Sequence, residues 1–384
     1  MQRRNFLRLV GGGTVVAVGA GLGGCSSAVP PEALVAWQGP PADLELRRWV
    51  LSHALLAPHS HNLQSWIVEL RGADEMLLHC DRERLLPQTD PLSRQIMMSH
   101  GTFLELLAIA AAERGRRAEI TLFPEGAFGA AGPDDRPVAH VRLLADAGQA
   151  RDPLFAQILR RHTHRGAYDA APVPAAAWQA MAAAAAAPGL HFGHVDATAG
   201  EAMARHRQIA AEAWRIELTT PRTILESFQV LRVGAAEVAR HRDGLTLMDP
   251  MVVLLDKLGL FDRTVAPAAD SFATRGQIED FEASLAATPA FLWLTSDGNE
   301  RVTQVDSGRA YARVQLAATA HGVVMQPLSQ ALQEYEEQRA TYAAIHALVG
   351  AAQPAQTVQM WARVGPAAPT TPSPRRPLDA ILRP

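Results

Sequence analysis

The chain has 384 residues, of which 48% are hydrophobic and 20% are charged, and its net charge is −3 at neutral pH. This length and apolar content suffice for two hydrophobic cores or for one large intertwined core. Proteins that bind nucleic acid need a basic surface, so the slightly acidic balance argues against nucleic acid as a partner.

The first 25 residues have the pattern of an export signal. Arginines at positions 3 and 4 precede an apolar, glycine-rich run over 9–22, which leads into Gly23-Gly24-Cys25. About 14 apolar residues are fewer than the roughly 20 that a membrane-spanning helix needs. Residues 1–25 resemble a twin-arginine signal that ends in a lipobox, which implies export and a lipid on Cys25. We therefore expect a periplasmic protein or a lipoprotein that contacts the membrane only through Cys25, with 26–40 as a linker.

Residues 41–150 are predicted to form a first structural half. Asp90-Pro91 is typical of a helix start, with the aspartate as N-cap and the proline at the first helical position, and Gly115 suits the end of that helix. The predicted elements in chain order are a helix over 42–57, a loop over 58–64, strands over 66–70 and 76–80, the helix from Asp90 to Gly115, and strands over 118–123 and 138–144.

Residues 151–384 form the predicted second half, which is longer because it contains a largely helical insertion over 201–284. Thr198 is a candidate N-cap for the helices before residue 240, and Asp306 begins a capped helix that ends before Gly322. The predicted elements in chain order are a helix from Asp152 toward Arg160, a helix over 175–187, a strand over 190–195, helices within 198–240, a strand over 289–295, a helix over 306–321 and a strand over 357–364.

One pattern occurs in both halves at a spacing of 207 residues. The matching pairs are Gly101 with Gly308, Gly115 with Gly322, and Ile109-Ala110-Ala111 with Leu316-Ala317-Ala318. The repeat indicates that the two halves are related to each other.

Two motifs about a hundred residues apart carry the chemistry of the chain. The first, 57–66, reads Ala-Pro-His-Ser-His-Asn-Leu-Gln-Ser-Trp and offers hydroxyl, amide and backbone N–H groups to a planar heterocycle. The second, 160–165, reads Arg-Arg-His-Thr-His-Arg and gathers guanidinium groups, which match phosphate oxygens in a bidentate way. Together they indicate the two parts of one flavin site.

These motifs resemble those of the nitroreductase superfamily, whose flavin mononucleotide (FMN) enzymes carry a P-S-S-x-N-x-Q-P-W loop and an R-R/H-S-x-R/K phosphate motif. The chain most resembles the Acg-like branch, in which one chain holds two nitroreductase-like halves. The resemblance implies an α+β nitroreductase-like fold, in which the two halves form an intrachain pseudo-dimer around one noncovalent FMN. The chain departs from the family pattern at His59, Ser65 and Thr163. Thr163 keeps the hydroxyl of the usual serine, and His59 could change the flavin potential or merely fill space.

Carrying the family motifs over residue by residue places four groups of side chains and backbone atoms at the FMN. The loop lies against the ring, the arginine motif contacts the phosphate and the ring, a later segment faces flavin N5, and a C-terminal arginine pair clamps the phosphate. These cofactor-binding candidates are Pro58, Ser60, Asn62 and Gln64; Arg161, His162, Thr163 and Arg165; Met325, Gln326, Pro327 and Leu328; and Arg375 and Arg376.

The two halves have complementary losses, which predict one complete site. In dimeric relatives each flavin takes its phosphate cations from one subunit and its loop from the other. Here the first half has the loop but only Ala-Trp-Gln-Gly-Pro at 36–40 in place of an arginine cluster, and the second half has the cluster but degenerates to Ala-Pro-Gly-Leu at 187–190. Within the insertion, 243–261 could form a lid over the flavin or an extra helical layer on the core.

The resemblance implies an FMN-dependent oxidoreductase of the nitroreductase type, which passes hydride or electrons to a small-molecule acceptor from an unknown donor. The flavin carries that chemistry, so no catalytic acid or base is nominated. The alternative is a flavin-sequestering or redox-sensing protein with a closed lid and little turnover, because an exported enzyme meets no appreciable NAD(P)H pool. We expect a monomer with a pseudo-dimeric core, and further self-association stays open.

The remaining histidines and the second cysteine receive ordinary structural interpretations. Imidazoles two residues apart can share a metal ion, but no cysteine or acid completes a known ligand spacing around His59 and His61 or around His162 and His164. We therefore predict no metal site. Cys80 is expected to be a buried strand residue without chemistry.

Overall fold

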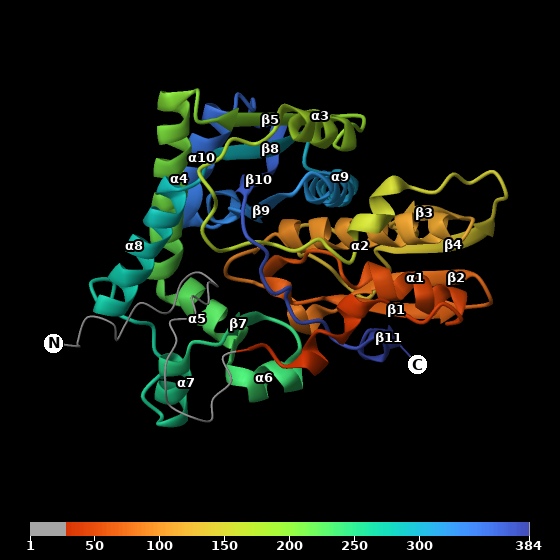
Figure 1. Cartoon of the computed structure of the whole chain (residues 1–384), viewed down its shortest axis with the longest axis horizontal. Helices are drawn as coiled ribbons and strands as arrows, with labels where there is room; N and C mark the ends of the chain where they lie inside the picture. The colour runs from red at the N-terminus through yellow and green to blue at the C-terminus, as the bar shows by residue number, and fades with distance from the viewer. Residues whose placement is uncertain (1–27, 384) are drawn as a thin grey trace.

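A computed structural model describes residues 28–383, so the predicted signal and Cys25 lie outside the described part of the chain. The first of its two main sheets has the strand order β11-β1-β2-β4-β3 (Figure 1). It comprises β1 (Trp66–Arg71), β2 (Glu75–Cys80), β3 (Arg116–Leu122), β4 (Ala139–Ala145) and β11 (Leu382–Arg383). β11 pairs in parallel with β1, Leu382 opposite Val68, so the C-terminal segment returns to the sheet of the first half.

The second main sheet is antiparallel and has the order β5-β8-β10-β9. Its strands are β5 (Leu190–Asp196), β8 (Ala290–Asp297), β9 (Val323–Pro327) and β10 (Gln356–Pro366). A separate two-stranded parallel sheet lies within the insertion and consists of β6 (Leu231–Val233) and β7 (Leu245–Leu247). The predicted α+β class is therefore confirmed, with two antiparallel-rich sheets and helices packed against them.

Two long helices, α2 (Arg94–Glu113) and α9 (Arg301–Ala320), pack against each other between the two main sheets (Figure 1). They cross at Gly101 and Gly308, one of the two glycine pairs of the 207-residue repeat. A Cβ atom on Gly101 would lie 1.9 Å from the carbonyl oxygen of Val305, and one on Gly308 would lie 1.9 Å from that of Met98. Only residues without a side chain permit this approach, and the contact is reciprocal between the two helices.

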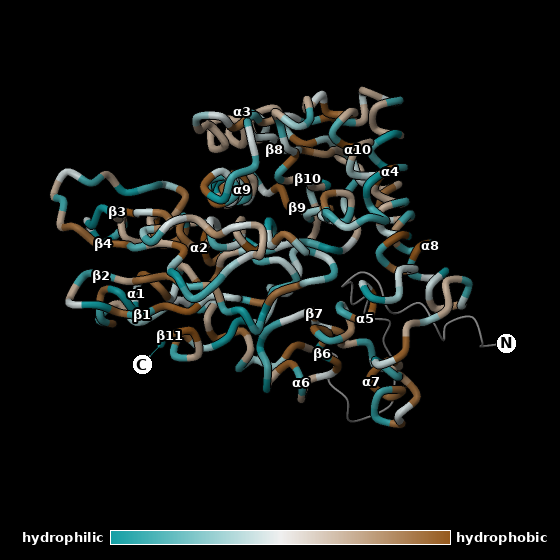
Figure 2. Tube along the Cα trace, turned by 180° about the vertical axis from the view of Figure 1, so that it is seen from behind, coloured by the Kyte–Doolittle hydropathy of each residue, from teal (hydrophilic) through white to brown (hydrophobic). Residues whose placement is uncertain are grey.

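α2 is also the single described helix that is long and apolar enough to cross a bilayer by composition, but 89% of its most apolar window is buried inside the protein. Its apolar character therefore reflects a core position. Figure 2 shows hydrophobic segments along the central strands and helices, and also on the outer helix α7. The remaining helices are α1 (Leu46–Ala54), α3 (Ala175–Ala184), α4 (Gly200–Thr219), α5 (Pro221–Gln229), α6 (Gly234–His241), α7 (Pro250–Lys257), α8 (Phe272–Ala286) and α10 (Arg339–Leu348).

Three predicted helix starts are wrong, and local hydrogen bonding explains two of the differences. α2 begins at Arg94 and not at Asp90-Pro91, but the Asp90 carboxylate still accepts the backbone N–H groups of Gln95 and Ile96, at 3.2 and 3.0 Å. The Thr198 hydroxyl donates to Asp196 and does not cap α4.

The helix expected from Asp306 begins five residues earlier, at Arg301, with Glu300 as its N-cap residue. Two other predicted helices are shorter in the structure. The helix expected over 42–57 is limited to Leu46–Ala54, because the Glu45 side chain caps it by accepting the N–H groups of Arg47 and Arg48. The helix expected from Asp152 is a short 3-10 segment over Pro153–Gln157.

Candidate functional site

The loop after α1 is held in an uncommon backbone conformation. His61, Asn62 and Gln64 have positive φ angles of 49°, 55° and 54°, which cost energy for residues other than glycine. α2 fixes the loop from one side, because the hydroxyl of Thr102 donates to the Pro58 carbonyl at 2.7 Å. Such strain persists only where neighbouring groups enforce it, so the loop presents its polar atoms in a defined arrangement.

His59 fastens the two ends of this loop together. Its Nε2 accepts the backbone N–H of Ser65 at 3.1 Å, so the neutral ring carries its proton on Nδ1 and donates it to the Ser60 carbonyl at 2.7 Å. Burial lowers the pKa of His59 to about 3, which keeps the ring neutral. The structure therefore gives His59 a positioning role beyond filling space.

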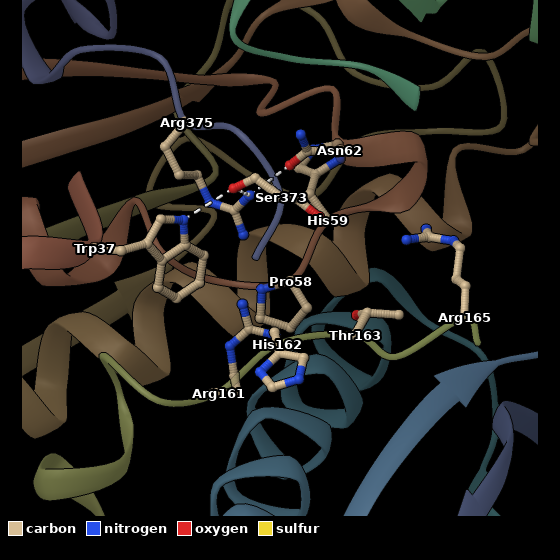
Figure 3. A pocket seen from close by; sticks show the side chains of 10 residues that line it. All are labelled: Trp37, Pro58, His59, Asn62, Arg161, His162, Thr163, Arg165, Ser373 and Arg375. Carbon is tan, nitrogen blue, oxygen red and sulfur yellow. Dashed lines mark hydrogen bonds between the residues drawn. The ribbon is translucent and has the colours of Figure 1, made fainter. Parts of the chain in front are cut away.

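Two buried arginines from distant parts of the chain meet beside the loop. Arg161 donates to the Leu56 carbonyl at 2.7 Å and to Gln315 at 2.9 Å, and it is 2% exposed. Arg375 donates to Asn62 Oδ1 at 2.7 Å and to the Leu56 carbonyl at 3.1 Å, and it is 4% exposed. The guanidinium carbons of Arg161 and Arg375 lie 5.6 and 5.0 Å from the centre of the Trp37 ring. Figure 3 shows the three side chains near one another.

The charge of this arginine pair is not balanced by acids within residues 28–383. Neither Arg161 nor Arg375 forms a salt bridge there, and the Nε atom of each has no hydrogen-bond partner in that range. Burial lowers the pKa of Arg161 to about 10 and that of Arg375 well below its ordinary value, yet arginine stays protonated at neutral pH. Two desolvated cations with spare donors form a site for an anion.

Arg161 and Arg375 line a small cleft, called the arginine cleft below. This cleft opens into a cavity of about 570 Å³. Both spaces are lined by Pro58, His59 and Asn62 of the loop, by Thr163 and Arg165, and by Ser373. Ligand pockets typically measure about 300–1,000 Å³, so this volume accommodates a cofactor-sized molecule with further room beside it. The cavity continues between α2, the end of β9 and the inserted helices α4, α5 and α8.

The insertion also contacts the loop over 58–64 and covers part of it. The N–H of Gly244 donates to the Asn62 carbonyl at 3.0 Å, and Asn62 Nδ2 donates back to the Gly244 carbonyl at 3.4 Å. β7 and Met248 follow along the cavity wall. The next helix, α7, exposes Leu254 to solvent, and Leu258 directly after it is also exposed, so 244–248 covers the site whereas α7 lies outside it.

Comparison with known proteins gives the family context of this geometry. Two Mycobacterium tuberculosis proteins, one from strain CDC 1551 and one from strain H37Rv, are each 29% identical to the chain over 350 residues, which is 88% of this chain and 92% of theirs. Both carry the name "Putative NAD(P)H nitroreductase". The chain is therefore similar to these two proteins over most of its length. No protein-family model matches it.

Solved structures that match the chain are shorter proteins and align with only part of it. An FMN-dependent nitroreductase from Mycobacterium smegmatis, solved with NADPH, has a TM-score of 0.38 and 20% identity and covers 59% of this chain and 95% of its own. A Bacteroides fragilis nitroreductase with bound FMN has a TM-score of 0.31 and 15% identity and covers 56% and 89%.

The structure brings most of the residues predicted from the sequence to these two adjoining spaces. Those lining the cleft or the cavity are Pro58, Ser60, Asn62, Arg161, His162, Thr163, Arg165, Gln326, Pro327 and Arg375. A backbone bridge between Thr163 and Met325, with the N–H of His164 donating to the Met325 carbonyl at 3.1 Å, joins the arginine motif to β9.

Four other predicted residues line neither space. Met325 and Leu328 are buried in the core. Gln64 donates its amide to the Arg242 carbonyl at 3.0 Å and accepts the backbone N–H of Arg376 at 2.9 Å. The Arg376 guanidinium points away from the cleft and donates to the Ala380 carbonyl at 2.7 Å.

Several residues that line the cleft or the cavity were not predicted from the sequence. Trp37, whose ring lies beside the two guanidinium groups, belongs to the segment 36–40, which the family motifs distinguish only by its lack of arginines. Its indole N–H donates to the Ser373 carbonyl at 2.9 Å. Trp214, Glu217 and Gln277 line the cavity from the insertion. Their positions depend on the packing of distant helices, and no local motif marks them.

Proposed function

We propose that the chain is an FMN-dependent oxidoreductase of the nitroreductase type, with one FMN held across the arginine cleft and the adjoining cavity. The observation that carries the proposal is the pair of buried guanidinium groups of Arg161 and Arg375, which lack an acidic partner within 28–383 and keep an unpaired Nε each. This donor set suits a phosphate dianion. The cavity next to it suits a planar ring system.

The residues around these spaces divide the tasks of holding the cofactor. Arg161 and Arg375 would hold the phosphate, and the Thr163 hydroxyl, Ser60 and Asn62 would meet the ring or its side chain. FMN, when bound, supplies hydride or electron transfer, and the protein supplies position and hydrogen bonding. The closure of 244–248 over Asn62 limits access of water to that side of the site.

Binding of FMN compared with riboflavin tests the phosphate role. Arg161→Gln should weaken FMN binding about 10- to 100-fold, the range for one charge-assisted hydrogen bond of about 1.5–3 kcal/mol, and should hardly change riboflavin binding. Arg117→Gln, which changes an exposed arginine on β3, is the matched control. The proposal would be refuted if the wild-type protein bound neither flavin. It would also be refuted if Arg161→Gln bound FMN and riboflavin with the same affinities as wild type.

The alternative role, flavin storage or sensing, is favoured by one observation, the reciprocal hydrogen bonds by which Gly244 closes over Asn62. Reduction of the flavin-loaded protein by dithionite, followed by anaerobic mixing with a quinone or a nitroaromatic, separates the two roles. Rapid reoxidation supports the oxidoreductase, and prolonged inertness supports storage. Chemical reduction makes the outcome independent of the physiological electron donor.

We further propose that the two halves form a pseudo-dimer with one complete site, and that the protein is exported as a lipoprotein. The reciprocal crossing at Gly101 and Gly308 and the complementary motif losses support the first proposal, which predicts one FMN per chain by flavin absorbance. The signal-like residues 1–25 support the second. A Cys25→Ala variant should then leave the membrane fraction for the soluble one.

A further inference from the structure

The outer side of α7 and the turn after it expose an apolar face. Met251, Leu254 and Leu258 follow one another at spacings of three and four residues, which places them along one side of the helix. These residues are 38%, 49% and 62% exposed, and Leu260, just beyond the turn, is 69% exposed. We call the four residues the α7 patch. Figure 2 shows hydrophobic residues on α7 at the outer edge of the molecule.

The inner side of α7 is already packed. Val252 is 4% exposed and belongs to a hydrophobic cluster with Leu231 and Val233 of β6. A surface helix normally turns a polar face to water once its inner face is buried. The segment 251–272 instead holds six of the ten large hydrophobic residues that are exposed within 28–383, at positions 251, 254, 258, 260, 265 and 272. Such a concentration is typical of an interaction surface.

The N-terminal segment enters the described part of the chain beside this patch. Val29 packs against Val238 of α6 and against Met248, and α7 begins two residues after Met248. Cys25 lies three residues before Ala28 in the sequence, and three residues span at most about 11 Å. A lipid on Cys25 would therefore hold the α6–α7 side of the insertion close to a bilayer.

We propose that the α7 patch docks on the surface of a lipid bilayer, with Leu254, Leu258 and Leu260 entering the interface between headgroups and acyl chains. The proposal rests on the proposed export as a lipoprotein, because the anchor brings this face to the membrane. The apolar faces of helices that lie in a membrane surface are buried by about 5–10 Å. The patch fixes the orientation of the protein on the bilayer, and the lipid on Cys25 supplies most of the attachment.

The charges around the patch indicate that apolar burial holds it on the membrane. The segment 249–263 has three acids and two bases, so it lacks the basic cluster that attracts anionic lipids. Asp249 caps the start of α7, Asp256 lies 3.5 Å from Arg263, and Asp262 accepts two hydrogen bonds within its own turn. Lys257 is exposed at the end of α7, where its ammonium group can reach lipid phosphates while its methylene chain stays in the apolar layer. Docking should therefore need no anionic lipid and should resist salt.

Lys257 also provides the probe for the test, because it is the only lysine of the chain. The full-length protein is labelled there with an amine-reactive, environment-sensitive dye, and peptide mass spectrometry confirms the position of the label. The labelled protein is then combined with phosphatidylcholine vesicles that carry nitroxide quenchers at the top of the acyl chains. We expect about a twofold loss of fluorescence, which persists in about 1 M salt, where the Debye length is about 3 Å.

Matched variants separate docking of the patch from mere closeness to the vesicle. Lys257→Arg combined with Arg117→Lys moves the single lysine to β3, which Figure 1 shows on the opposite side of the molecule, and this label should keep its fluorescence. Leu254→Gln combined with Leu258→Gln should protect the Lys257 label to the same extent, because glutamine keeps the helix propensity and removes the apolar surface. Val302→Gln, at an exposed apolar residue of α9, should behave like wild type. All these positions are exposed, so the fold should be retained.

A Lys257 label that the vesicle lipids leave unquenched would overturn the docking surface, whether or not Cys25 carries a lipid. The mass of the Cys25 peptide is measured on the same sample. Protein without that lipid whose label is still quenched would refute the lipoprotein proposal and leave the docking surface standing. Sedimentation of the Cys25→Ala variant tests a second copy as the occupant, and a dimer that dissociates on adding Leu254→Gln and Leu258→Gln would overturn the membrane assignment.

Discussion

Glu217 is buried on α4, and no residue within 28–383 forms a salt bridge with it, so its protonation state is tied to folding. In the unfolded chain its pKa lies near the ordinary 4.5, and in the folded chain burial raises the pKa to about 7. Between these two values the folded protein holds a proton that the unfolded chain has lost. By linkage, the free energy of unfolding falls as the pH rises through this window, and the whole penalty is present above about pH 7.

Glu217→Gln should remove this penalty, because the amide has nearly the same shape and can still accept from Gln333. We expect the variant to be more stable than wild type at pH 8 by up to about 3 kcal/mol and close to wild type at pH 4.5. Urea unfolding at the two pH values measures the difference, with Glu212→Gln as control. A variant that is less stable than wild type at pH 8 would show that the ionised carboxylate contributes favourably.

Residue-scale reasoning from sequence found Arg161 and Asn62 because their motifs are local. It was less accurate for adjacent residues, since Arg375 and Arg376 look alike in the sequence but point in different directions. Arg375 enters the cleft, whereas Arg376 turns toward Ala380. The distance from Arg376 Nη1 to Asp81 Oδ2 is 3.9 Å. Only the path of the returning C-terminal segment decides which of the two faces the loop.

The element that organises the molecule is the crossing of α2 and α9. Each helix approaches the other at a glycine, and the missing side chains bring the two backbones into contact. Helices that pack through larger residues are separated by about 8–10 Å, and glycine at the crossing allows a shorter distance. The cleft is built from groups on both sides of this crossing, since Thr102 on α2 fixes the loop and Gln315 on α9 fixes Arg161.

Gly101→Ala should therefore destabilise the protein by about 1–3 kcal/mol or more, because the new methyl group would overlap the Val305 carbonyl and force the helices apart. Gly308→Ala should have a similar effect through the Met98 carbonyl. Gly200→Ala, at the exposed start of α4 with open space around it, serves as the control and should be neutral. Thermal unfolding of the three variants provides the comparison, and equal melting temperatures would contradict the close crossing.

Periodicity predicted both long helices and the strands of the two main sheets except β9 and β11, since the core faces of these elements repeat over many residues. It could not find β11, which has two residues and exists only because the C-terminus pairs with β1. Helix starts were missed where a side chain caps from a distance, as Asp90 does for α2. The cavity wall from α4, α5 and α8 was unpredictable for the same reason: its position depends on long-range packing and on no local pattern.

For the molecule as a whole, buried histidines should make the fold sensitive to acid. Burial lowers the pKa of five histidines to about 3 or 4 (His59, His61, His100, His206 and His346). Below pH 6.5 the unfolded chain takes up protons on these rings and the folded protein does not, so the free energy of unfolding falls as the pH decreases. Two buried carboxyls act in the opposite direction, since burial raises the pKa of Asp90 to about 6 and that of Glu217 to about 7.

The histidines outnumber these carboxyls, and the protein should therefore lose on the order of several kcal/mol of stability between pH 7 and pH 5. His206 offers a clean test, because its ring stacks on Phe291 and Trp293 and its Nδ1 has no hydrogen-bond partner among residues 28–383. His206→Phe keeps the stacking and should reduce the pH slope of the unfolding free energy by about one proton. His321→Asn, at an exposed position, serves as the control variant. Urea unfolding in steps from pH 7 to pH 5 measures the slope, and an unchanged slope in His206→Phe would show that this ring is protonated in the folded protein.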